Sequence, residues 1–197
     1  MSKKSVSASI LVLFLALVFA VIGACFSSFV YIDKKIKFEE IKLVSVSGVS
    51  IFEDKEYAKP TSRLKLSDME LGLKPATGEV DAETKIPSTI TDEGTSEGYY
   101  ETIYVKSIIP YKIVINNIKI ENQKDAEKAN AERENIFVAI KDVVDSTKSF
   151  ETDEIIVAEM GENYAEREFT FLFWLSSFSG EELVGSTITF TIEFKTI

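Results

Sequence analysis

The longest uncharged stretch of this chain lies near its N-terminus, over residues 5–32. From residue 8 onward it is almost wholly apolar. A helix needs roughly 20 apolar residues to span the hydrocarbon core of a bilayer, so this stretch can cross a membrane with some tilt. The sequence therefore predicts two parts, which are a transmembrane or signal segment over residues 1–32 and a single domain over residues 33–197.

Three interpretations of the apolar segment remain open. It fits a retained signal anchor, because the apolar run is long for the corresponding part of a cleaved signal peptide. Residues 22–25 (IGAC) also resemble a bacterial lipobox, in which Cys25 would be acylated after cleavage before it. The residues that follow, 26–32 (FSSFVYI), are larger and more apolar than those that usually follow a lipobox. Ordinary cleavage near Ala24 or Ser28 would instead secrete the domain.

The basic residues beside the segment do not decide its orientation. Lys3 and Lys4 precede it, but Lys34, Lys35 and Lys37 follow it, and the positive-inside rule counts basic residues on both sides. A short basic N-terminus before a long apolar run is, however, typical of exported proteins. We therefore expect the domain to lie outside the cell, attached to the membrane.

The composition is that of a folded acidic domain. Hydrophobic residues make up 45% of the chain and charged residues 27%, which allows a substantial core. The formal charge is -10, and because Lys3 and Lys4 are the charged residues of the N-terminal segment, residues 33–197 carry -12. Such a surface repels phosphate groups, so no nucleic acid partner is expected.

The chain has no histidine, and its one cysteine, Cys25, lies in the apolar segment. This excludes catalytic sites that need histidine or a thiolate, as well as disulfides and cysteine-ligated metals in the domain. A carboxylate-based glycosidase would need two acidic groups facing each other across a cleft. Neighbouring acidic residues are normally solvated instead, and we predict no catalytic, cofactor-binding or metal-binding residues. The acidic pairs considered are Asp153 with Glu154, Glu166 with Glu168, and Glu181 with Glu182.

Most of the domain shows strand-like patterns. The predicted strands are residues 36–47, 49–52, 66–73, 99–109, 111–121, 136–144, 155–158, 169–175 and 188–194. The alternation changes parity at Asn116 and Asn117, which predicts a β-bulge there. Residues 122–135 are predicted to form one short, polar, solvent-facing helix. Because the helices and strands do not alternate, the expected fold is mainly β, a single antiparallel β-sandwich or jelly-roll-like domain.

The C-terminal strands carry the strongest pattern. Large apolar residues occupy every second position in both runs, alternating with Thr170, Leu172 and Trp174 in the first run and with threonines and Glu193 in the second, and we expect the two runs to form a strand pair. Burial of each large side chain stabilises the fold by about 1.5–3 kcal/mol, so this face is expected to be core and not a ligand pocket. The residues are Phe169, Phe171, Phe173, Leu175, Ile188, Phe190, Ile192 and Phe194.

Residues 74–98 form the longest irregular stretch of the domain. Its acidic residues could supply oxygen ligands to calcium, but their spacing fits no DxDxDG loop. A solvated connection is the favoured interpretation, and cation binding by this loop stays open. The acidic residues are Asp81, Glu83, Asp92, Glu93 and Glu97.

Residues 169–175 (FTFLFWL), the acidic Glu181 and Glu182, and the closing strand 189–194 (TFTIEF) resemble the last two strands of the TasA/camelysin family of Firmicutes surface proteins. The apolar N-terminus before a single β-domain is also similar. The resemblance implies an exported jelly-roll-like domain of surface fibres or biofilm matrix. It does not carry over the protease activity linked to the camelysin name, because no histidine is available to hold zinc.

These observations favour a non-enzymatic, membrane-tethered cell-surface protein. It would bind other surface or matrix proteins, or further copies of itself, through strand addition at a sheet edge. Two alternatives are a carboxylate-based extracellular hydrolase and an accessory subunit of a membrane complex that recognises its partner through the anchor helix. The partner, the oligomeric state and the biological process are left open.

Overall fold

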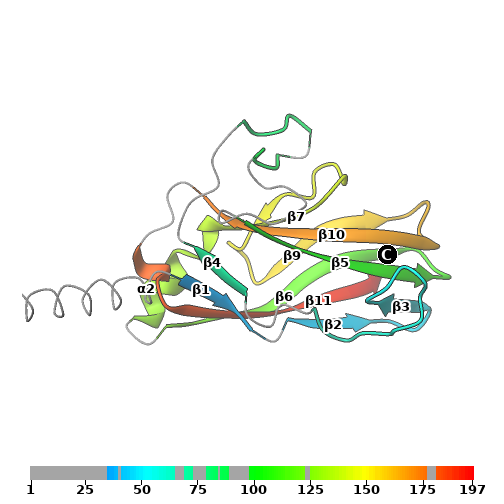
Figure 1. Cartoon of the computed structure of the whole chain (residues 1–197), viewed down its shortest axis with the longest axis horizontal. Coiled ribbons are helices and arrows are strands. Elements are labelled where there is room, and N and C mark those ends of the chain that lie inside the picture. The colour runs from blue at the N-terminus through cyan, green and yellow to red at the C-terminus, as the bar shows by residue number, and fades with distance from the viewer. Residues whose placement is uncertain are drawn as a thin grey trace, which may run out of the picture. The chain divides into compact units, whose positions relative to one another are not determined.

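The fold is given by a computed structural model, which describes residues 35–39, 41–64, 69–72, 79–83, 85–88, 98–122, 125–176 and 181–197 (Figure 1). These residues belong to one compact unit, Lys35–Ile197. Cys25 and the apolar segment 5–32 lie outside the described residues. Within the described ranges, no helix has the length and apolar character that a membrane span requires.

The domain that begins at Lys35, which we call the head, is mainly β, as predicted. Its strands form two sheets that enclose one main core. In the first sheet the order is β4 (Met69–Gly72), β1 (Lys35–Phe38), β11 (Ser186–Thr196), β6 (Tyr111–Asn122) and β9 (Glu154–Met160), and β2 (Lys42–Ser45) also pairs with β11. In the second sheet the order is β3 (Val49–Phe52), β5 (Gly98–Ser107), β10 (Glu166–Leu175), β7 (Ile136–Ile140) and β8 (Lys148–Ser149). The sandwich prediction is therefore confirmed at this level.

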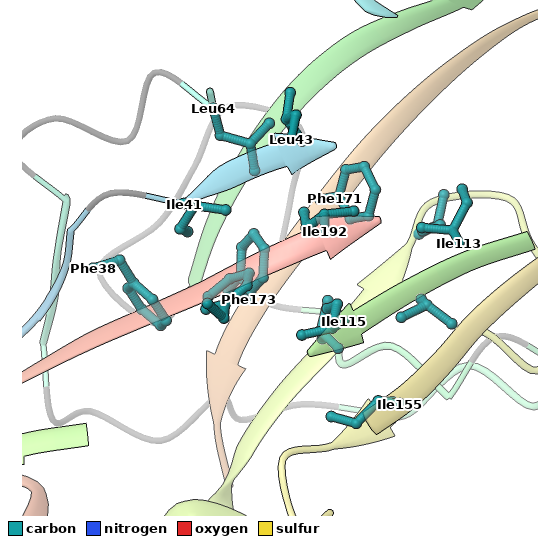
Figure 2. Close-up of a cluster of buried hydrophobic side chains, with 14 of the residues drawn as sticks. Phe38, Ile41, Leu43, Leu64, Ile113, Ile115, Ile155, Phe171, Phe173 and Ile192 are labelled. Atoms are coloured by element: carbon teal, nitrogen blue, oxygen red, sulfur yellow. The ribbon is translucent and has the colours of Figure 1, made fainter. Parts of the chain in front are cut away.

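Alternating apolar residues from both sheets meet in the core. Figure 2 shows Phe171 and Phe173 of β10 beside Ile192 of β11, and Ile113 and Ile115 of β6 nearby. All five side chains are fully buried. The stripe of Phe and Ile predicted to be core is confirmed as core, and it supplies much of the hydrophobic stabilisation of the head.

The predicted pairing of the two C-terminal strands is wrong. β10 is hydrogen-bonded to β5 and β7 in the second sheet, whereas β11 lies in the first sheet beside β6, β1 and β2. The two strands face each other across the core instead, where the Phe173 and Phe190 ring centroids are 5.6 Å apart. An alternating pattern specifies which face of a strand is buried, but it does not specify the neighbouring strand.

The sheets are antiparallel except where β1 and β2 meet β11. Lys37 of β1 lies opposite Thr187, and Leu43 of β2 lies opposite Ile192, in both cases in parallel register. The strand predicted over residues 36–47 is thus two short strands that follow the same neighbour. Ile41, between them, is buried in the core.

Two local predictions are confirmed. The register of β11 against β6 shifts between Thr189 and Thr191, and Asn117 has a φ of 54°, so a bulge lies at the predicted position. Asparagine tolerates this left-handed conformation better than most residues do. The polar segment forms α2 (Ala126–Ala131) and the 3₁₀ turn η1 (Arg133–Asn135), with Ala129 as the buried residue of α2.

Candidate functional site

The acidic pairs considered as catalytic candidates lie on the surface. Asp153 is 2.7 Å from a guanidinium nitrogen of Arg133, and Glu154 is 3.2 Å from the ammonium of Lys195. Both carboxylates are exposed to solvent. Each is thus engaged in a surface ion pair with a basic residue.

Of the remaining candidate residues, Glu166, Glu168 and Glu182 are also exposed. Glu166 and Glu168 lie on the outer face of β10, where Glu166 is 2.8 Å from the Lys106 ammonium, and Glu182 is exposed in η2 (Glu181–Leu183). Within the residues that the structure describes, no group of three or more acidic or other metal-ligating side chains is gathered as a metal site would require.

Within the long loop 74–98, the described residues 79–83 and 85–88 belong to a small hairpin, which we call the hairpin 79–88. The amide of Ser88 donates to the carbonyl of Glu79 at 2.9 Å, and Val80 bridges to Pro87. The Asp81 carboxylate accepts the Glu83 amide at 3.0 Å, which places two of the acidic residues considered as calcium ligands in a turn. Asp92, Glu93 and Glu97 lie outside the described residues, so cation binding by this loop stays an open question.

This hairpin covers a second apolar cluster, which we call the outer cluster. Ala139, Leu172 and Trp174 lie on the outer face of the second sheet and are buried. The Trp174 ring stacks on Phe137 at 5.7 Å, and Ile86 of the hairpin packs against the cluster. The loop is therefore partly a structural cover and not simply a solvated connection.

The edges of the two sheets at β2 and β3 are closed by the chain itself, through residues 59–64. The Leu43 amide of β2 donates to the Ser62 carbonyl at 2.8 Å. On the other sheet, the Thr61 amide donates to the Ile51 carbonyl of β3 at 2.9 Å. Strand addition by another protein would have to displace this segment.

β9 is the longest strand at a sheet edge. It pairs with β6 on one side, and no strand of the described part of the chain pairs with its other side. Its seven residues alternate between buried and exposed, with Glu154, Ile156 and Glu159 facing solvent. The register shifts where Val157 inserts as an extra residue, so the strand contains a bulge. Bulges and exposed charges both limit unselective pairing at a sheet edge.

A further surface lies on the outer face of the second sheet, at the end of β5 and β10 that is farther from Trp174. Phe52, Tyr57 and Tyr104 form a half-buried cluster of rings there, which we call the aromatic patch. The residue pattern does not predict this patch, because Tyr57 stands alone in a polar loop. The available signal was the parity of Phe52 and Tyr104, which places both on the face opposite to the core residues Ile51 and Ile103.

Comparison of the chain with protein-family models, curated proteins and solved structures finds no match in any of the three.

Proposed function

We propose that this chain is a non-enzymatic surface protein that residues 5–32 attach to a membrane. Its head would lie outside the cell and bind other surface or matrix proteins, or further copies of itself. The proposal includes a retained transmembrane anchor and a jelly-roll-like relative of the TasA/camelysin proteins. Support comes from the length of the uncharged segment, from the short basic N-terminus that precedes it, as in exported proteins, and from the mainly β architecture.

The observation that carries the proposal is that no strand among the described residues pairs with the outer side of β9. An extended segment of a partner can add there as a further strand, because the backbone amides and carbonyls of an edge strand that do not face its neighbour remain available. The competing edges at β2 and β3 are already covered by residues 59–64. β8 has two residues and β4 has four, so each offers a shorter template than the seven residues of β9.

The charge around β9 indicates which partner segment would fit. Glu151, Asp153 and Glu162 flank the strand, and Glu154 and Glu159 lie in it, with all five exposed. The neighbouring Arg133 and Lys195 each pair with one of them. A segment with lysine or arginine at alternate positions would therefore meet complementary charge, and acidic segments would be repelled.

Photo-crosslinking on intact cells tests this proposal. Ile156 of β9 and Val44 of β2 lie on the outer face of the same sheet and are 41% and 44% exposed. Each is replaced in turn, in the full chain, by a photoreactive p-benzoylphenylalanine. We expect discrete crosslinked adducts from position 156 and few from position 44, because the β2 edge is covered.

A second variant separates edge pairing from chance proximity. Glu159→Pro removes a backbone amide of β9 while Ile156 keeps its place, and it should reduce the adducts from position 156. Circular dichroism must show that the variant keeps its fold. Equal crosslinking at positions 156 and 44, or none at either, would contradict binding at the β9 edge.

A further inference from the structure

The aromatic patch is built from two neighbouring strands and the turn that follows the first of them. Phe52 of β3 lies directly opposite Tyr104 of β5 on the outer face of the second sheet. Tyr57, from the turn, stands edge-on to both rings, with centroid distances of 5.4 Å to Phe52 and 6.4 Å to Tyr104. All three rings are half-buried, so part of each remains accessible to a ligand.

The turn holds Tyr57 in this place. The Asp54 carboxylate accepts the amides of Ala58 at 2.9 Å and Lys59 at 2.7 Å, and the Tyr57 amide donates to the Asp54 carbonyl at 3.1 Å. Tyr57 adopts a φ of 56°, a left-handed conformation that a bulky residue rarely takes. The hydrogen bonds to Asp54 therefore hold the ring over the sheet in a conformation that the residue itself disfavours.

The patch already holds one cation, which belongs to the chain. The Lys106 ammonium lies 5.2 Å from the centroid of the Tyr57 ring, within the range of a cation–π interaction. The same ammonium is 2.8 Å from Glu166, and more than half of the Lys106 side chain is exposed. The faces of these rings are thus in a position that attracts ammonium or guanidinium groups.

Several carboxylates act on the patch. Burial raises the pKa of the Tyr104 phenol, and the carboxylates of Glu168, Glu56 and Asp54 raise the pKa further because they disfavour a second negative charge. Glu168 lies directly opposite Tyr104 in the neighbouring strand β10. The Lys106 charge is matched by Glu166, which leaves the other carboxylates to act on an incoming group.

We propose that the aromatic patch is a second binding surface, which receives a lysine or arginine side chain of an extended partner protein. The incoming cation would lie over the Tyr57 and Tyr104 rings and replace Lys106 there, while the carboxylates of Asp54, Glu56 and Glu168 complement its charge. A neutral or acidic partner gains nothing from these carboxylates. This surface lies on the second sheet, so it is separate from the β9 edge of the first sheet.

Peptide binding to the full chain, kept in a neutral detergent, tests the proposal. The probe is a fluorescein-labelled peptide of four Lys-Thr repeats, followed by fluorescence anisotropy, and a peptide of four Glu-Thr repeats is the charge control. Unlabelled cellohexaose, added as a competitor, asks whether the rings bind a sugar instead. We expect binding of the lysine peptide alone, with no competition by the oligosaccharide.

Two substitutions at Tyr57 separate the ring from the rest of the side chain. Tyr57→Leu keeps an apolar residue but removes the aromatic face, and it should weaken peptide binding by roughly two- to five-fold, as expected for one exposed cation–π contact. Tyr57→Phe keeps the face and should bind within about two-fold of the native chain. Thermal unfolding checks that both variants remain folded.

Lys106→Met gives the sharpest outcome, because it removes the resident cation and frees Glu166. The lysine peptide should then bind more tightly, by roughly two- to five-fold. Lys119→Met, at an exposed position on the outer face of the first sheet and beyond the residues of β6 that pair with β9, removes the same charge elsewhere and should have a smaller effect. Unchanged or weaker binding by Lys106→Met would overturn the proposal, as would equal binding of the acidic peptide or displacement of the probe by cellohexaose.

Discussion

Tyr111 brings a phenol into the centre of the sandwich. Its ring packs against Phe194 at 5.6 Å and Phe169 at 6.4 Å, but within the described part of the chain its buried hydroxyl has no hydrogen-bond partner. A buried polar group left unpaired costs about 1–3 kcal/mol. We therefore expect Tyr111→Phe to raise the free energy of unfolding by about 1 kcal/mol in urea at neutral pH. A loss of stability would show that the hydroxyl is bonded.

Tyr111 also makes the free energy of unfolding depend on pH in the alkaline range. Burial raises the pKa of Tyr111 well above the usual 10.0 of a tyrosine, and the nearby Arg167 opposes this only in part. Above pH 10 the unfolded chain therefore releases this proton while the folded chain keeps it, so stability falls as the pH rises. The advantage of Tyr111→Phe over the native chain should grow above pH 10. Parallel pH profiles would contradict this prediction.

At the scale of elements, the hairpin 79–88 is expected to act as a cover for the outer cluster. Ile86→Asp should detach it, because a carboxylate cannot remain against Trp174 and Leu172 without water. Trp174 is the one tryptophan of the chain, so its fluorescence should shift to the red. Val80→Asp, at a residue of the same hairpin that is 57% exposed, is the control and should leave the emission unchanged. A native-like spectrum for Ile86→Asp would show that the hairpin does not shield Trp174.

Helix α2 depends on its N-terminal cap. The Asp125 carboxylate accepts the Lys128 amide at 3.1 Å, and this hydrogen bond is the main reason that the pKa of Asp125 is lowered. A lowered pKa in the folded state means that the cap stabilises above the ordinary aspartate pKa and that this contribution is lost as the pH falls below it. Asp125→Ala should lower the melting temperature at pH 7, and the difference should narrow below pH 4. A difference that does not change with pH would argue against the ionised cap.

At the scale of the whole molecule, sequence patterns predicted faces better than partners. The alternation in residues 169–175 and 188–194 correctly predicted that the stripe of large apolar side chains is buried in the core, since the residues that share one face of a strand follow from the local sequence. The pairing of β10 with β5 and β7 involves residues distant in the chain, which a local pattern does not encode. The same limit explains the parallel placement of β1 and β2 beside β11.

The candidate surfaces were harder to predict than the fold. Strand addition was expected, but the choice of β9 depends on residues 59–64 closing the other edges, which is a tertiary feature. Tyr57 reaches the aromatic patch because it adopts a left-handed backbone conformation in its turn, which the polar sequence of the loop does not predict. Leu172 and Trp174 are covered by a hairpin more than eighty residues earlier in the chain, a contact that the pattern within their own strand does not encode.

We propose that the N-terminal segment displays the sandwich outside a membrane. Cysteine labelling on intact cells tests it most directly, because the head contains no cysteine of its own. In a Cys25→Ser chain, Val144→Cys places one thiol at an exposed position of the head, and Ser2→Cys places one before the apolar segment. We expect a membrane-impermeant maleimide to label position 144 on intact cells, and to label position 2 only after the cells are lysed. Labelling of position 144 that requires lysis would contradict the account.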